Sequence, residues 1–197
     1  YITLTADFDG TYTFSFDESG KDLSVTYPTA YTVTYSKSII GTDNSTTAAP
    51  TATYNSGATS VTSTHYVPAS TSVTFDAKTA GSGYTWKGWY DNNAGTGNAL
   101  STNLAYTRSI TANTTIYAVY TANTYTVKFD ANGGSGNMSN QNFTYGTAQN
   151  LTANTFTRTG YTFAGWATSA NGNKVYNDKQ SVSNLSSTNG AIVTLYA

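Results

Sequence analysis

The segment GYTWKGWY at residues 83–90 returns as GYTFAGWA at residues 160–167. Each copy is followed by a segment rich in β-branched and aromatic residues, TIYAVY at 115–120 and IVTLYA at 192–197. The same landmarks in the same order indicate an internal duplication. Tandem arrays of this kind usually span distance or present surfaces instead of performing catalysis.

Each copy also opens with an alternating segment, YTVTYS at 31–36 and YTVKFD at 125–130. Alternation with a period of two predicts a half-buried strand. With 14% aromatics and 17 tyrosines, the composition is typical of β-sheet surfaces. The predicted fold class is therefore mainly β, α+β at most, with little helix.

Charge and cysteine content exclude several classes of function. Only 10% of residues are charged and the formal net charge is −1, so nucleic-acid binding is not expected. The chain has no cysteine, which excludes disulfides, thiolate metal ligands and a thiol nucleophile. No apolar run reaches the roughly 18–20 residues that cross a bilayer, so membrane insertion is not expected. This composition, poor in Lys and Glu and rich in Thr and Asn, suits an exported bacterial protein, extracellular or on the cell surface.

Three parts are predicted along the chain. In residues 1–29, GTYTFSF and DLSVTYP flank the turn DESGKD, which predicts a β-hairpin, expected to end a preceding domain. Residues 30–122 form the first repeat and residues 123–197 the second, more compact one. The first repeat has 17 surplus residues before the shared motif, so an extra hairpin or long loop is expected near 39–64. A single helical turn is expected within 179–186.

The second repeat resembles a known family. Its segments YTVKFDANGG, TRTGYTFAGWATSANG and SVSNLSSTNGAIVTLYA resemble the Listeria–Bacteroides repeat, whose family includes the B repeat of internalin B. The first repeat shares YTVTY, GYTWKGWYD and TIYAVY with it. The resemblance implies a small β-grasp-like fold, found in bacterial surface and secreted proteins without catalytic activity. Separately, residues 1–28 resemble the end of a carbohydrate-binding β-sandwich.

Comparing the copies separates two kinds of position in the repeated motif. Trp89 and Trp166, with Gly88 and Gly165, occur in both copies and are predicted to form the structural core of the repeats. Burying one indole ring removes roughly 150–250 Å² from water, worth about 4–6 kcal/mol. The glycines are expected to mark a bulge or a close backbone approach.

Trp86 and Tyr90 occur in the first copy only, since Phe163 and Ala167 replace them in the second. They are therefore the candidate ligand-binding residues, as an exposed platform on which a sugar could stack.

Metal and catalytic sites are weakly indicated. DFDG at 7–10, DNNAGTGN at 91–98 and DANGGSGN at 130–137 alternate oxygen-bearing residues, yet such clusters also form tight turns for steric reasons. His65 is the only histidine, and no nucleophile-elbow motif accompanies it. No catalytic residue, cofactor-binding residue or metal ligand is predicted.

The sequence thus predicts a non-catalytic repeat module of a bacterial surface or secreted protein, acting as a spacer or adhesion segment. It is expected to be a monomer within a longer multi-domain chain, with a host protein or a glycan as partner. The alternative is a carbohydrate-binding module array attached to a glycan-capturing or glycan-degrading protein.

Overall fold

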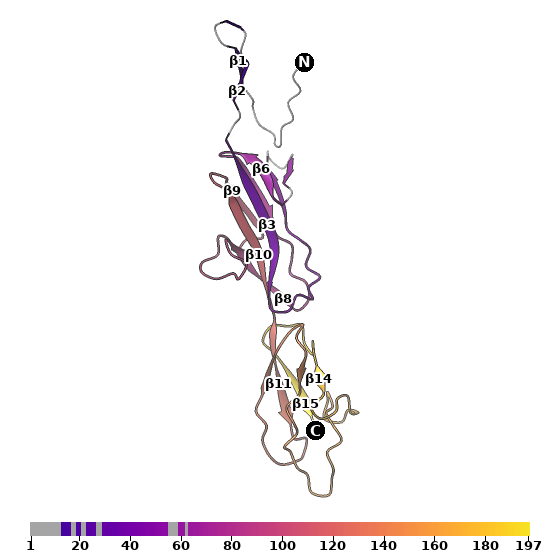
Figure 1. Ribbon diagram of the computed structural model, residues 1–197. Helices are drawn as coiled ribbons and strands as arrows, with labels where there is room; N and C mark the ends of the chain where they lie inside the picture. Colours follow the sequence, from indigo (N-terminus) through magenta and orange to yellow (C-terminus); the bar gives the residue numbers. More distant parts are fainter. Residues whose placement is uncertain (1–12, 17–18, 21–22, 27–28, 55–58, 62) are drawn as a thin grey trace. The chain divides into compact units, whose positions relative to one another are not determined.

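The computed structural model describes residues 13–16, 19–20, 23–26, 29–54, 59–61 and 63–197. All regular elements in these residues are strands, so the predicted mainly β class is confirmed (Figure 1). This part of the chain has no helix that could span a membrane. The helical turn expected within 179–186 is wrong. Lys179 has a φ of 55°, outside the right-handed helical region, and the short strand β14 (Ser181–Val182) follows it.

The segment predicted to form an N-terminal hairpin contains two described strands. β1 (Thr13–Phe16) pairs antiparallel with β2 (Leu23–Thr26), and Phe16 lies opposite Leu23. Most of the segment that resembles a carbohydrate-binding β-sandwich lies outside the described residues.

The first repeat contains two four-stranded sheets. One has the order β6 (His65–Pro68), β3 (Ala30–Ile40), β10 (Thr114–Ala122) and β8 (Tyr84–Tyr90). The other has the order β5 (Thr59–Val61), β4 (Thr51–Tyr54), β7 (Ser72–Asp76) and β9 (Ala105–Ser109). The antiparallel pair β4–β5 lies between β3 and β6 in the chain, within the segment where an insertion was expected, and it widens the second sheet.

Aromatic side chains join these two sheets. Phe75 on β7 lies 5.9 Å from the ring of Tyr35 on β3 and 5.8 Å from the ring of Trp89 on β8. Phe75 and Trp89 are fully buried. The alternation seen in YTVTYS therefore places its inward-facing residues against the second sheet.

The second repeat is built around β11 (Thr124–Asp130) at the centre of a three-stranded sheet. β12 (Gln141–Thr144) pairs with it antiparallel, and β15 (Ala191–Tyr196) pairs with it parallel (Figure 1). The short strand β13 (Gln149–Asn150) pairs with β14 in a separate ladder. The first and last strands of the repeat are thus neighbours, as in a β-grasp-like arrangement.

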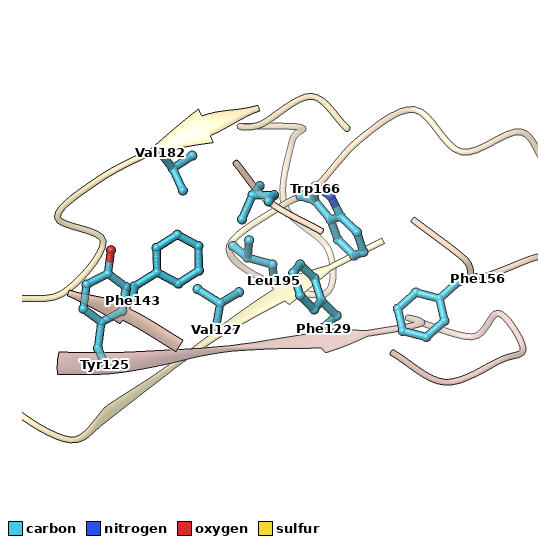
Figure 2. Packing of buried hydrophobic residues seen from close by; sticks show 9 residues of the cluster. Tyr125, Val127, Phe129, Phe143, Phe156, Trp166, Val182 and Leu195 are labelled. Carbon is cyan, nitrogen blue, oxygen red and sulfur yellow. The ribbon is translucent and has the colours of Figure 1, made fainter. Parts of the chain in front are cut away.

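The core of the second repeat lies on one face of this sheet. Tyr125, Val127 and Phe129 alternate along β11 and point to the same side (Figure 2). The cluster they form with the rest of the repeat contains Tyr125, Val127, Phe129, Phe143, Leu151, Phe156, Trp166, Val182 and Leu195.

The described residues divide into two compact units whose limits differ from those of the two repeats. The first unit comprises residues within 1–38, 48–79 and 87–119, and the second comprises 39–47, 80–86 and 120–197. Two segments of the first repeat, 39–47 and 80–86, therefore belong to the second unit.

Candidate functional site

A buried asparagine lies where the two repeats meet. Asn123 is the single residue between β10 and β11, and it is 7% exposed. A buried asparagine carries a backbone donor and acceptor as well as the amide donor and acceptor of its side chain. Leaving any of them unpaired costs about 1–3 kcal/mol.

All four kinds of group on Asn123 are hydrogen-bonded. Its backbone N–H donates to the Gly83 carbonyl at 2.8 Å, and its carbonyl accepts from the Tyr145 N–H at 2.8 Å. Its side-chain Oδ1 accepts from the Thr85 hydroxyl at 2.6 Å, and its Nδ2 donates to the Ser187 carbonyl at 2.7 Å. Asn123 thus binds the GYT segment of the first repeat and two loops of the second; we call this set of residues the Asn123 junction.

Tyr84 adds a second layer of contacts to the junction. Its hydroxyl donates to the Thr42 carbonyl at 2.7 Å and accepts from the Asn44 N–H at 2.9 Å. Its ring meets that of Tyr145 edge-on, with centroids 5.6 Å apart. Gly83 has a φ of 80°, and a Cβ there would overlap the Tyr145 ring, so a side chain at this position would push the rings apart.

Residues 42–44 reach the second repeat directly. The hydroxyls of Thr42 and Thr147 lie 2.9 Å apart, and Asn44 Nδ2 donates to the Gly146 carbonyl at 3.3 Å. The Gly146 N–H in turn donates to Asn184 Oδ1 at 2.6 Å. Every group in these bonds is a neutral amide, hydroxyl or carbonyl. The bonds should therefore change little with salt concentration or with pH near neutrality.

The candidate ligand-binding residues differ in exposure. Trp86 is half-buried, and its ring lies 5.0 Å from that of Tyr120. Tyr90 is 6% exposed, and the ammonium group of Lys87 lies 5.6 Å from the centre of its ring. A sugar-stacking platform needs an open ring face, which Tyr90 does not present.

The backbone at Gly88 explains why Tyr90 is covered. Gly88 has a φ of 143°, so the alternation of β8 is interrupted and Trp89 and Tyr90 are both buried. A Cβ on Gly88 would lie 2.8 Å from the Ser101 carbonyl oxygen. Gly165 repeats this geometry with a φ of 142°, and a Cβ there would meet the Tyr176 carbonyl.

Trp89 and Trp166 are both 0% exposed, yet their indole groups differ. Trp89 Nε1 donates to the Leu104 carbonyl at 3.0 Å. Trp166 Nε1 is buried and meets no acceptor among the described residues. The Trp166 ring packs instead against Phe129 and Phe163, with centroids 4.8 and 4.9 Å away.

The second repeat carries a groove of about 450 Å³ beside its GYTFAGW motif. Residues 161–165 line it, together with Ala131, Asn132, Gly134, Phe156, Thr157, Arg158 and Ala197. The Arg158 guanidinium lies 4.3 Å from the centre of the Tyr161 ring and donates to the Asn132 carbonyl at 3.3 Å.

The described acidic and amide turns use their oxygen atoms internally. Asn92 Oδ1 accepts from the Thr96 N–H at 3.0 Å, and Asp130 Oδ1 accepts from the Asn132 N–H at 2.8 Å. DFDG at 7–10 lies outside the described residues. Among the residues that the structure describes, no three His, Cys, Asp or Glu residues gather as metal ligands would.

His65 lies on β6, and its backbone is opposite Val33 of β3. Its ring lies 6.2 Å from that of Tyr54, which is buried. The immediate neighbours of His65 in these contacts are thus an aliphatic and an aromatic residue, neither of which is an acid.

Sequence reasoning did not find Asn123. Its hydrogen-bond partners all lie 22 residues or more away along the chain. The one usable signal was its position: an Asn, with no turn-forming neighbour, standing where two alternating segments abut.

An all-β chain in which the GYT-x-x-GW motif and its closing segment occur twice is a tandem repeat protein. The model of the Listeria-Bacteroides repeat domain matches residues 51–119 and 125–197. The chain therefore belongs to the Listeria–Bacteroides repeat family, as its motifs predicted. Repeats of this family occur in bacterial surface or secreted proteins.

Among solved structures, the Bacillus anthracis TIE protein aligns with 85% of this chain at 13% identity, with a TM-score of 0.39. The chain spans 33% of the length of that protein chain.

Proposed function

We propose that this chain is a non-catalytic spacer module of a bacterial cell-surface or secreted protein. The observation that carries the proposal is the Asn123 junction. A flexible tether between repeats would be exposed and free of tertiary hydrogen bonds. The link here is one buried residue, and its four hydrogen-bond partners, from both repeats, all belong to the second compact unit, so this part of the chain is folded and is not a tether.

The family and the composition support the same role. The family is generally non-catalytic. With few charged residues on the chain, spacer function would also depend little on ionic strength.

The proposal is tested by measuring a distance across the repeats. The chain has no cysteine, so Ser82→Cys and Asn171→Cys introduce two unique, exposed labelling sites, one from each repeat and both within the second unit. With spin labels on these two cysteines, double electron–electron resonance should give a single narrow distribution of label–label distances. That distribution should broaden when Asn123→Ala is added. A broad distribution without that change would contradict a spacer role.

The carbohydrate-binding alternative now depends on Trp86 alone, because Tyr90 is buried. A glycan array with starch and host glycans, run on the unaltered chain and on Trp86→Ala, separates the two functions. The spacer proposal predicts that neither the unaltered chain nor Trp86→Ala binds any glycan on the array. Binding that disappears with Trp86 would replace it with the carbohydrate-binding role, and the same array tests a host glycan as partner.

A further inference from the structure

Three asparagines of the second repeat are each followed by glycine. The pairs are Asn132–Gly133, Asn171–Gly172 and Asn189–Gly190. Glycine has no side chain beside its backbone nitrogen, so that nitrogen can approach the amide carbon of the preceding asparagine. Each pair is therefore chemically able to lose ammonia from the asparagine side chain, and the folded structure decides which pair does so.

Hydrogen bonds control this reaction. The asparagine side chain must rotate until its Cγ meets the glycine nitrogen, and that nitrogen must first give up its proton. A hydrogen bond that holds the side-chain amide or the glycine N–H has to break beforehand, and it adds its free energy to the barrier.

Two of the three pairs are held in this way. Asn132 Nδ2 donates to the Ala170 carbonyl at 2.8 Å. Asn189 Oδ1 accepts from the Thr124 N–H at 3.1 Å, and the Gly190 N–H donates to the Thr124 carbonyl at 2.7 Å. Both reacting groups of the Asn189 pair are thus bound to the first residue of β11.

The third pair lies in an exposed turn. Asn171 is exposed, and its side chain makes no hydrogen bond to the residues that the structure describes. The Gly172 N–H donates to the Ser169 carbonyl at 3.0 Å, three residues back in the same turn. A single bond within an exposed turn opens at a low free energy. The side chain of Asn171 is then already free to reach the nitrogen.

We propose that Asn171 is a site of spontaneous deamidation, with water as the co-reactant. The Gly172 nitrogen loses its proton to hydroxide and bonds to Asn171 Cγ, and the bond from Cγ to Nδ2 breaks to release ammonia. Water then adds to one of the two carbonyls of the resulting cyclic imide and opens it to aspartate or isoaspartate. The net change is one water consumed and one ammonia released, without oxidation or reduction.

The product differs from the original turn in two ways. It carries a carboxylate in place of a neutral amide, which adds one negative charge to a chain whose formal net charge is −1. In isoaspartate, the main chain also runs through the former side-chain carbon. Because Asn171 is exposed and lies outside the hydrophobic core, the fold of the repeat should survive both changes.

Trypsin cuts after lysine and arginine, and it separates the three pairs. Asn132 falls in the peptide 129–158, Asn171 in 159–174 and Asn189 in 180–197. The folded chain is kept in mildly alkaline buffer and digested at intervals, and each peptide is analysed by mass spectrometry for aspartate and isoaspartate. These products should accumulate about tenfold faster in 159–174 than in the other two peptides.

Asn132 is the matched comparison, because Asn132 and Asn171 share the local sequence Ala-Asn-Gly. In guanidinium chloride these two should react at similar rates, since the bond from Asn132 to Ala170 is then lost. Gly172→Ala places a methyl group beside the nitrogen and should slow the reaction in 159–174. The nearest atom to that methyl group is the Ser169 hydroxyl oxygen, at 2.6 Å, which can rotate away, so this variant should fold.

Three results would overturn the proposal. They are equal rates for the three peptides of the folded chain, an excess for 159–174 over 129–158 that is just as large in guanidinium chloride, and modification of Asn173 in place of Asn171. The distance measurement uses a variant without Asn171, so the spacer role and this site are tested separately.

Discussion

Replacing Asn123 tests whether the junction between the repeats depends on hydrogen bonding or only on filling space. Asn123→Ala keeps both backbone bonds and removes the side-chain bonds to Thr85 and Ser187, at 2.6 and 2.7 Å. Asn123→Asp keeps the size and the acceptor for Thr85. It replaces the donor to Ser187 with a second acceptor, which faces a carbonyl.

The magnitudes follow from these contacts. Each lost hydrogen bond costs about 0.5–1.5 kcal/mol net, so Asn123→Ala should destabilise the second unit by about 1–3 kcal/mol. Thr85 and Ser187 are exposed and can bind water, which favours the lower half of that range. Asn123→Asp should cost more, because a buried charge is placed against a carbonyl oxygen.

The assay is urea unfolding, with amide hydrogen exchange at Tyr145 as a local readout. The Tyr145 N–H donates to the Asn123 carbonyl, so its protection reports on the junction itself. Asn142→Ala is the matched control. Asn142 is exposed, accepts one hydroxyl bond from Thr126 at 3.1 Å, and should change stability by less than about 0.5 kcal/mol.

The order of the two variants decides the question. If packing alone mattered, the isosteric Asp would be tolerated better than Ala. An Asp variant as stable as the unaltered chain at neutral pH would therefore refute the hydrogen-bonding account. Recovery of the Asp variant at acid pH, where a protonated carboxyl can donate to Ser187, would support it.

Two further predictions concern the core. Trp89→Phe loses a hydrogen bond to the Leu104 carbonyl, whereas Trp166→Phe loses an indole N–H without a described acceptor. Urea unfolding should therefore show that Trp89→Phe lowers the free energy of unfolding by about 1–3 kcal/mol more than Trp166→Phe does. Equal losses would contradict this. Burial raises the pKa of Tyr125 above its ordinary value of about 10, although the Leu185 N–H bonded to it acts the other way. The folded chain then holds a proton that the unfolded chain releases, so stability should fall as pH rises past about 10. Tyr125→Phe should lessen that fall, and an unchanged pH profile from 8 to 11 would argue against it.

Much of the fold could be predicted because it is local. Alternation in YTVTYS and YTVKFD predicted β3 and β11, and the repeated GYT-x-x-GW motif predicted a duplicated unit. A count of residues predicted an insertion near 39–64; the antiparallel pair β4–β5 lies in that segment, and the family match begins inside it, at residue 51. Each of these inferences needs only spacing along the chain.

The local failures have local causes that the residue letters do not reveal. Val182 and Leu185, three apart, suggested a helical turn, but Lys179 adopts a positive φ and β14 pairs with β13 instead. Tyr90 was expected on an open face because it occurs in the first copy only, and the bulge expected at Gly88 did not by itself give the direction of Tyr90. A φ of 143° at that glycine turns Tyr90 inward.

The sequence by itself determined that this protein is a β-rich tandem repeat of the Listeria–Bacteroides family, because periodicity and motif order survive without coordinates. The tertiary structure alone decided how consecutive repeats connect. Asn123 contacts Gly83, Thr85, Tyr145 and Ser187 only after the strands within each copy have paired. Hydrogen bonds and grooves depend on distances between segments remote in the chain, and those distances are fixed only by folding.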